Sequence, residues 1–151
     1  MGGYGGTSGR KKERCYYDTG NKKVIDNNAI TVAEHYLREG KYVAFLKKLD
    51  PIKRPDLSLD HEMIVEVKGV TSLKYDRMRF RIADGFDQIQ KEWSMYPKGK
   101  RHPGKVIILS LNDNFDESYK AAVKGYRIAK SEGSVHGTVE FWHHGQIYEL
   151  K

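Results

Sequence analysis

Residues 54–69, which read RPDLSLDHEMIVEVKG, decide the fold of this chain. Residues 63–68 alternate as a strand does, because successive side chains of a strand point to opposite faces of its sheet. Glu66 and Lys68 therefore share a face near the end of the strand. A short extended segment that carries Asp56 precedes them, and the two segments can pair as a hairpin. Asp56 would then lie beside Glu66, which gives a site of two carboxylates and one lysine.

Two neighbouring carboxylates offer the oxygen ligands that hard cations such as Mg²⁺ and Mn²⁺ prefer. Pro55-Asp56, the gap that follows and Glu66-Val67-Lys68 resemble the signature of the PD-(D/E)xK nuclease superfamily. The resemblance implies a restriction-endonuclease-like α-β-β-β-α-β core and a metal-dependent endonuclease. It implies that Asp56 and Glu66 ligate Mg²⁺ or Mn²⁺. Lys68 would orient or help to deprotonate the attacking water and stabilise the pentacovalent phosphate.

A helix is predicted over residues 28–40, with an apolar stripe of Ile30, Ala33 and Leu37. Glu34 falls on this stripe, where a carboxylate is unfavourable unless a cation compensates its charge. The alternative is that Glu34 lies at the edge of the stripe and reaches water. In the superfamily the first core helix often carries a glutamate that contacts the metal or its water. The resemblance therefore implies that Glu34 completes the carboxylate shell.

A second helix is predicted over residues 78–96, with an apolar stripe of Ile82, Phe86, Ile89 and Trp93. Gln88 lies on one flank of this stripe and Gln90 on the other. Many members of the superfamily carry a glutamine in this helix that reaches the site, so the resemblance implies this role for Gln88, with Gln90 next. The usual motif adds a tyrosine four residues later, where this chain has Glu92. The alternative is a solvated helix flank.

The remaining elements extend the core. They are strands over 42–46 and 105–111, a helix over 116–130, and a hairpin of 138–142 and 146–150. The fold class is therefore α/β, a single domain with a mixed sheet and a C-terminal helix plus hairpin. Residues 1–20 are glycine-rich and predict a flexible leader, so the nuclease domain spans 21–151. We expect no signal peptide and no membrane segment.

The chain carries 27 Lys and Arg against 20 Asp and Glu, a net charge of +7. This balance favours a polyanionic partner. Two basic segments flank the predicted site and are expected to bind nucleic-acid phosphates with a salt-dependent affinity. They are Arg77, Arg79 and Arg81 after the Glu66 strand, and Lys98, Lys100, Arg101, His102 and Lys105 before the next strand. The alternative is a basic surface that only keeps the protein soluble.

Residues 28–90 further resemble the C-terminal nuclease toxin domains of CdiA-type contact-dependent growth inhibition proteins and related bacterial polymorphic toxins. This resemblance implies cleavage of RNA, with tRNA favoured, or of DNA. It also implies a cognate immunity protein, and delivery to the target-cell cytoplasm as part of a secreted or cell-surface bacterial effector. Because the segments around the predicted site are basic, we expect that immunity protein to be acidic.

Two other functions are consistent with the composition. One is a metal-independent ribonuclease that uses histidines as general acid and base, for which the chain offers His61, His136, His143 and His144. The other is a nucleic-acid-binding module without catalysis. Neither accounts for clustered carboxylates, which would repel a phosphate if no metal were bound.

Overall fold

The computed structural model describes residues 15–17, 26–46, 54–97 and 103–151. The helices are α2 (Asn27–Arg38), α3 (Tyr75–Trp93) and α4 (Phe115–Ser131). The strands are β1 (Cys15–Tyr17), β2 (Val43–Phe45), β3 (Leu57–Leu59), β4 (Met63–Val70), β5 (Gly104–Ser110), β6 (Thr138–His143) and β7 (Gln146–Glu149). None of these described helices is long and apolar enough to cross a membrane.

The predicted α/β class and mixed sheet are confirmed, and so are the C-terminal helix and hairpin. The elements from α2 to β5 follow the order α-β-β-β-α-β, and α4, β6 and β7 come after them. The bounds of α3 differ most from the prediction, because the helix begins directly after Lys74, whose backbone is still extended, and ends before Ser94. The sequence pattern therefore identifies every helix and strand from α2 onward, with small errors at their ends.

The strands lie side by side in the order β1 to β7. Strands β2, β3 and β4 form an antiparallel meander, β4, β5 and β6 are parallel, and β7 returns antiparallel to β6. Cys15–Tyr17 belong to the segment predicted to be a leader, yet they pair in parallel with Val43–Phe45 and extend the sheet at its edge. The glycine-rich residues before them lie outside the described residues.

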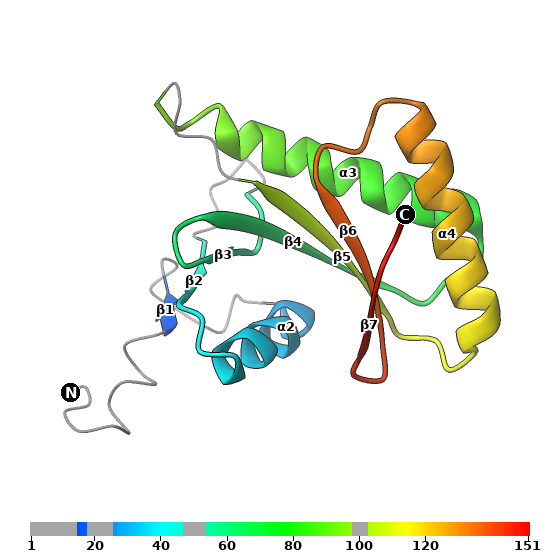
Figure 1. Ribbon diagram of the computed structural model, residues 1–151, viewed down its shortest axis with the longest axis horizontal. Coiled ribbons are helices and arrows are strands. Elements are labelled where there is room, and N and C mark those ends of the chain that lie inside the picture. The colour runs from blue at the N-terminus through cyan, green and yellow to red at the C-terminus, as the bar shows by residue number, and fades with distance from the viewer. Residues whose placement is uncertain (1–14, 18–25, 47–53, 98–102) are drawn as a thin grey trace.

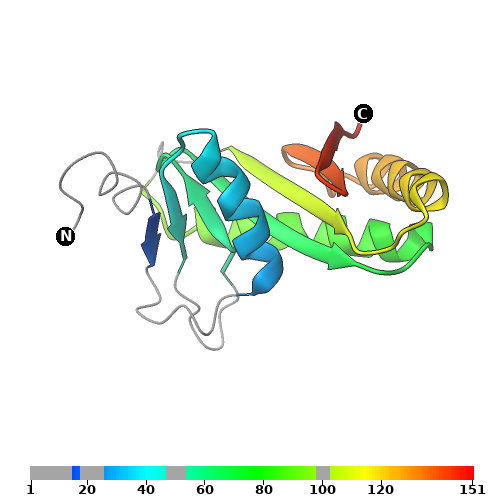
Figure 2. The same cartoon turned by 90° about the horizontal axis from the view of Figure 1, so that it is seen from below.

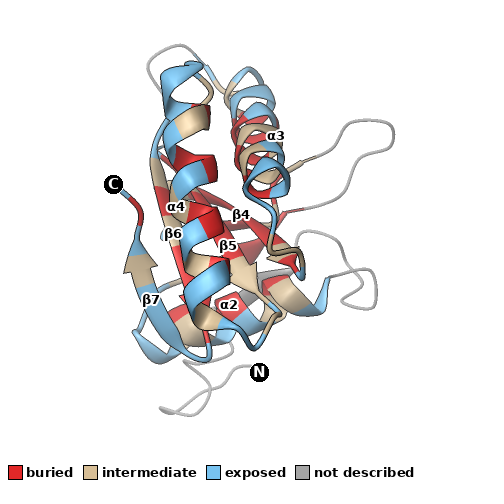
Figure 3. Cartoon of the chain, turned by 90° about the vertical axis from the view of Figure 1, so that its right-hand side faces the viewer, coloured by how far each residue is buried: buried red, intermediate tan, exposed pale blue. Residues whose placement is uncertain are grey.

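Helices cover both faces of the sheet. Helices α3 and α4 pack on one face and α2 on the other (Figures 1 and 2). Strand β4 serves both layers, because Ile64 and Val70 join the cluster under α3 and α4 whereas Val65 and Val67 join the cluster under α2. The predicted alternation of β4 is thus confirmed, and the inner sides of α3 and α4 are buried while their outer sides are exposed (Figure 3).

Helix α4 approaches α3 closely at Gly125. A Cβ atom built on this glycine would lie 2.6 Å from the carbonyl oxygen of Tyr75 and 2.7 Å from the backbone nitrogen of Arg79. Both atoms belong to the backbone of α3, so no change of rotamer could make room for a side chain. The missing side chain of Gly125 therefore sets the distance between the two helices.

We expect Gly125→Ala to lower the free energy of unfolding by about 1–3 kcal/mol, because the added methyl group must push α3 and α4 apart. This loss should exceed the gain of about 1 kcal/mol that alanine ordinarily brings to a helix. Urea denaturation would measure the change, with Lys120→Ala on the exposed side of α4 as a control that stays near the wild type. A Gly125→Ala protein as stable as the control would show that the helices are not this close.

Candidate active site

The β3–β4 hairpin brings the predicted site residues together. Leu57 pairs with Val65 and Leu59 with Met63, and the chain reverses through Asp60 and His61, whose φ angles of 51° and 58° are both positive. The backbone N–H and the carboxylate Oδ1 of Asp60 bind the carbonyl and the N–H of Tyr42, each at 2.7 Å, which ties the turn to the start of β2. This register places Asp56, the residue before Leu57, opposite Glu66.

Two hydrogen bonds from backbone N–H groups to side-chain carboxylates hold Asp56 beside Glu66. The N–H of Asp56 donates to Glu66 Oε1 at 3.1 Å, and the N–H of Val67 donates to Asp56 Oδ2 at 2.9 Å. The carbonyl oxygen of Asp56 accepts from Leu46 N–H at 3.1 Å, so β2 also holds this segment. Glu66 is buried and Asp56 is half-buried. The two carboxylates therefore lie together, as the sequence pattern predicts, although Glu66 lies in the middle of β4, which continues to Val70 rather than ending before Gly69.

Lys68 links the strand to helix α3. Its Nζ lies 2.9 Å from Glu66 Oε2 and 2.7 Å from Asp84 Oδ2. Gln88 Nε2 donates to the same oxygen of Asp84 at 3.0 Å. Gln88 thus reaches the site, but it does so through Asp84, while Gln90 is exposed.

Asp84 is a site residue that the sequence analysis missed. It lies four residues before Gln88, and residues four apart lie on the same side of a helix. This spacing could have identified Asp84 from the sequence. A residue of α3 that contacts the site from the same side as Gln88 must lie on the same flank of the helix. The side chain of Asp84 is one third exposed, so this end of the group reaches solvent.

Burial dominates the electrostatics of Glu66. Burial, and after it the nearby Asp56 carboxylate, raise the pKa of this carboxyl to about 8, and Lys68 partly opposes the rise. Burial disfavours the charge on Lys68 as well, but its contacts with Glu66 and Asp84 outweigh that effect and raise the pKa of the ammonium. Lys68 therefore remains a cation near neutral pH, held by Asp84 even when Glu66 carries a proton.

A bound cation would compensate the negative charge of carboxylates that are buried at this site. Asp56 and Glu66 fit a divalent ion, since Mg²⁺ is commonly held by one or two carboxylates and completes its shell with water and substrate phosphates. Within the described ranges, no three His, Cys, Asp or Glu side chains are grouped so as to hold a metal ion. Within that part of the chain, the Asp56–Glu66 pair is the donor set that we consider for an ion.

The prediction for Glu34 rests on the wrong phase of helix α2. The residues of α2 that are buried are Ala29, Val32, Ala33 and Tyr36, whereas Glu34 is exposed. Helix α2 also packs against Val65 and Val67, on the face of β4 opposite to Glu66 and Lys68. Glu34 therefore faces solvent, and its position gives no reason to count it in the carboxylate shell.

A buried ion pair fixes the segment that carries Asp56. Arg54 Nε and Nη2 donate to the two oxygens of Glu92 at 2.9 and 2.8 Å, and the two side chains are 13% and 0% exposed. The Tyr96 hydroxyl also donates to Glu92, and burial together with Glu92 raises the pKa of Tyr96 to about 12. Glu92 thus anchors the chain two residues before Asp56 to helix α3, a role that the helix pattern alone did not indicate.

The predicted nucleic-acid-binding residues divide into several groups. Arg79 pairs with Asp76 and Glu132 at 3.1 and 3.2 Å. Lys105 is also engaged within the protein, at 3.0 Å from Glu140 and 3.0 Å from the Tyr36 hydroxyl. Lys105 was expected to be a free phosphate ligand, and its burial in this network argues against that role.

The other basic residues of the prediction are Arg77, which is exposed, and Arg81, which is half-buried. Lys98, Lys100, Arg101 and His102 lie outside the described residues, so their predicted role stays a prediction.

The four histidines lie in separate places, except for the chain neighbours His143 and His144, whose ring centroids are 4.2 Å apart. His61 and His136 precede the starts of the parallel strands β4 and β6, whereas His143 and His144 follow at the end of β6. His143 is buried with Nε2 2.9 Å from the carbonyl oxygen of Asn112, and the exposed His144 lies 3.2 Å from Asp113. This arrangement does not favour a pair of histidines as general acid and base.

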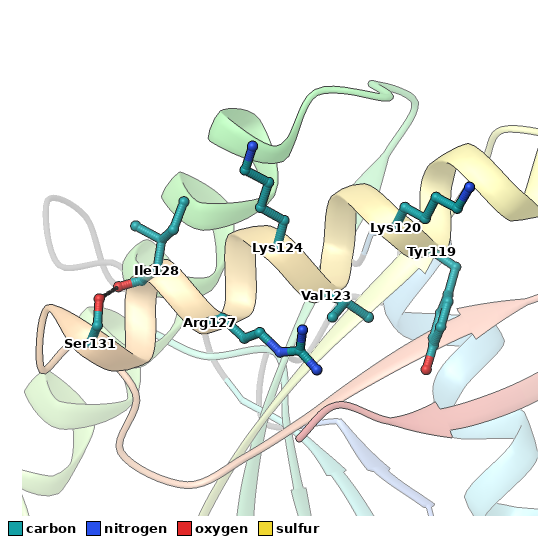
Figure 4. Close-up of a pocket in the computed structure, with 7 residues that line it drawn as sticks. All are labelled: Tyr119, Lys120, Val123, Lys124, Arg127, Ile128 and Ser131. Atoms are coloured by element: carbon teal, nitrogen blue, oxygen red, sulfur yellow. Dashed lines mark hydrogen bonds between the residues drawn. The ribbon is translucent and has the colours of Figure 1, made fainter.

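A pocket away from the carboxylate–lysine group lies on helix α4. It has a volume of about 550 Å³ and is lined by Tyr119, Lys120, Val123, Lys124, Arg127, Ile128 and Ser131 (Figure 4). All of these residues belong to α4, and none is a carboxylate or contacts Glu66 or Lys68. The pocket is therefore separate from the group formed by Asp56, Glu66 and Lys68.

The raised pKa of Glu66 predicts that stability without metal depends on pH. Between its ordinary value of 4.5 and about 8, folded Glu66 keeps a proton that the unfolded chain has released. The free energy of unfolding should therefore fall as pH rises through this range, by up to about 1.4 kcal/mol per pH unit for one proton. Urea denaturation in chelator at several pH values would measure this slope.

Glu66→Gln should remove that part of the slope, whereas Glu62→Gln, at an exposed position of the same hairpin, should leave it. An equal slope in wild type and Glu66→Gln would mean that Glu66 is ionised normally in the folded protein.

The buried Arg54–Glu92 pair should stabilise the folded protein, because each charge compensates the other. Glu92→Gln removes the carboxylate charge that Arg54 binds at 2.8–2.9 Å and should cost about 3–5 kcal/mol of unfolding free energy. Arg54→Leu combined with Glu92→Leu should be less destabilised than the sum of the two single changes, because no buried charge remains. Lys91→Gln, in an exposed pair on the same helix, is the control and should have little effect. Strict additivity would contradict a direct interaction.

Comparison with known proteins returned no match. No protein-family model matches the chain, and neither a curated protein nor a solved structure matches it. The function is therefore inferred from the residues and the geometry described above.

Proposed function

We propose that this protein is a metal-dependent endonuclease of the PD-(D/E)xK type, which hydrolyses phosphodiester bonds of nucleic acid. One observation carries the proposal. Lys68 Nζ lies between the carboxylates of Glu66 and Asp84, and Glu66 in turn binds the backbone of Asp56. The α-β-β-β-α-β order of the elements around this group supports the same assignment.

Asp56 and Glu66 would hold the Mg²⁺ or Mn²⁺ ion. A divalent cation bound there would supply a Lewis acid that lowers the pKa of a bound water and neutralises charge on the phosphate. The Asp56 carboxylate supplies negative charge that attracts the ion. Glu66 keeps a proton up to about pH 8 in the metal-free protein and would release it when the ion binds, because a ligating carboxylate must be deprotonated.

Lys68 would act on the charge that develops during the reaction. Its raised pKa keeps it protonated, so it is suited to donate hydrogen bonds to the water or to the phosphoryl oxygens rather than to remove a proton. This narrows the role that the resemblance implies for Lys68 from a base or orienting group to an orienting and charge-stabilising group.

Asp84 and Gln88 are positioning residues in this proposal. Asp84 fixes the Lys68 ammonium, and Gln88 fixes the carboxylate of Asp84 by a hydrogen bond to the same oxygen. The Arg54–Glu92 pair plays the corresponding part on the other side, because it holds the segment that carries Asp56. Such supporting contacts keep reactive groups in place before substrate arrives.

The net charge of +7 supports a polyanionic substrate. RNA, with tRNA favoured, or DNA is the substrate that we propose, since the carboxylate–lysine group acts on the phosphate rather than on the sugar. The bacterial toxin role, the acidic immunity protein and delivery to a target cell follow from the resemblance alone, and they stay predictions.

Size-matched substitutions would test the activity. Asp56→Asn, Glu66→Gln and Lys68→Met should each reduce cleavage by about 10²–10³-fold, because each removes a group that binds the metal or the developing charge. Asp84→Asn should lose about 10–100-fold, as supporting residues of a metal site commonly do. Cleavage of total RNA, purified tRNA and plasmid DNA would be followed with Mg²⁺, with Mn²⁺ and with chelator.

Two exposed carboxylates serve as controls. Glu34→Gln on α2 and Asp87→Asn on α3 should keep wild-type activity, because neither side chain contacts the group. Full activity of Glu66→Gln, or cleavage that persists in chelator, would refute the proposed mechanism.

A further inference from the structure

A pocket of about 390 Å³ opens where β4 ends and α3 begins. It is lined by Gly69, Val70, Thr71, Ser72, Lys74, Arg77 and Arg81, and we call it the arginine pocket. Three of these residues are cations and none is a carboxylate. Its volume falls within the range of about 300–1,000 Å³ that is usual for small-molecule sites.

The three cations of the arginine pocket have no charge partner among the described residues. Lys74, Arg77 and Arg81 form no ion pair there, although Arg79 on the same helix forms two. Acidic residues are therefore at hand in this region, but they compensate Arg79 and leave the pocket positive. An uncompensated cluster of this kind attracts an anion.

Arg81 supplies a second and independent observation. Its Nε is buried and has no hydrogen-bond acceptor in the described structure. A buried donor on a charged group is costly to leave unsatisfied, and such a group in a native protein calls for a water, an ion or a ligand. A change of the Arg81 rotamer toward the pocket would let a ligand oxygen accept from it.

The chemistry of the lining selects phosphate. Arginine presents a planar fork of N–H donors that matches the oxygens of a phosphate, and lysine adds a point charge. Helix α3 begins at this place, and its N-cap residue Lys74 makes no side-chain capping bond, so the positive end of the helix also faces this region. The hydroxyl of Ser72 accepts from Lys74 N–H at 3.0 Å, which orders the connection.

Strand β4 and helix α3 lie side by side (Figure 1), and both the arginine pocket and the proposed reaction site draw their residues from these two elements and the connection between them. Gly69 directly follows Lys68 in the strand, and Arg81 lies one helical turn before Asp84, which contacts Lys68. A strand whose scissile phosphate reaches Lys68 would therefore bring a neighbouring phosphate to the pocket.

We propose that the arginine pocket binds a backbone phosphate of the nucleic-acid strand next to the one that is cleaved. The inference rests on the proposed nuclease function and makes it more specific. Lys74, Arg77 and Arg81 hold this second phosphate, while Arg79 and Lys105 do not. The contact anchors the strand so that the scissile bond lies at Asp56, Glu66 and Lys68.

The test uses binding without turnover. A fluorescein-labelled single-stranded RNA and the same sequence in DNA are titrated with the full chain in chelator, and anisotropy gives Kd at several salt concentrations. Arg77→Gln and Arg81→Gln should each weaken binding about tenfold, as expected for a lost charge-assisted hydrogen bond. Each should also reduce the log–log salt slope by about 0.7, the value for one contact to a single strand.

Arg79→Gln removes the same charge from the same helix and is the matched control, which should bind like the wild type. Equal losses in Arg79→Gln and Arg81→Gln would overturn the inference, because they would indicate diffuse attraction to the whole helix. Circular dichroism checks that the variants fold, and the exposed Arg77 provides a variant in which folding is not at risk.

A second measurement uses inorganic phosphate as the probe. Phosphate should shift the amide NMR signals of Gly69 to Ser72 in the wild type and not in Arg81→Gln. If no such shift occurs, the pocket is not a phosphate site. If phosphate binds but neither oligonucleotide does, the pocket serves another anion and the inference fails.

One result would contradict the proposed nuclease function and leave the phosphate site intact. If the oligonucleotides bind through Arg77 and Arg81 but are never cleaved with Mg²⁺ or Mn²⁺, the hydrolase activity is wrong and the phosphate site stands.

Discussion

The contact of the Lys68 ammonium with Glu66 and Asp84 is the interaction on which the candidate site depends. A buried ammonium must be compensated, and here one partner comes from its own strand and the other from α3. The helix must therefore lie close to the sheet. Gly85 permits this, because a Cβ built there would lie 2.8 Å from Val106 Cγ2. The position of α3 over β4 is thus set jointly by packing and by charge.

The same site contains an energetically unfavourable arrangement, which is informative about function. Glu66 is buried next to Asp56, and this burial raises its pKa to about 8. A hydrophobic pair at the same positions would avoid that cost. Two ordered contacts maintain the arrangement, the Arg54–Glu92 pair before Asp56 and the Asp84–Gln88 bond beyond Lys68. Costly groups held firmly in place are typical of sites organised for a ligand or a reaction.

The hairpin was predictable because a strand has a period of two, so the alternation of residues 63–68 determines which side chains share a face. Helix α2 was harder. Ile30, Ala33 and Leu37 suggest one phase of the helix, but Val32 and Tyr36 are the residues that face the sheet, which moves Glu34 to the exposed side. Asp84 could be placed only through its spacing of four residues from Gln88, and Glu92 could not be placed from the sequence, because its partner Arg54 is distant in the chain. Contacts of this kind depend on how the helix packs, which a local pattern does not contain.

The basic residues of the chain differ in whether they are paired with a carboxylate inside the protein, and this difference decides which of them can attract a ligand. Arg79 and Lys105 are compensated by carboxylates within the fold, so they add little field outside the protein. Among the residues that the structure describes, Arg77 and Arg81 have no such partners, and they lie on the same helix as Asp84, toward its beginning. The seam between β4 and α3 is therefore negative near Glu66 and positive beyond Gly69. A polyanionic strand would be attracted to the positive part, and only a cation at the carboxylates would let it settle over the negative part. Strand binding and metal binding should therefore favour each other at this seam.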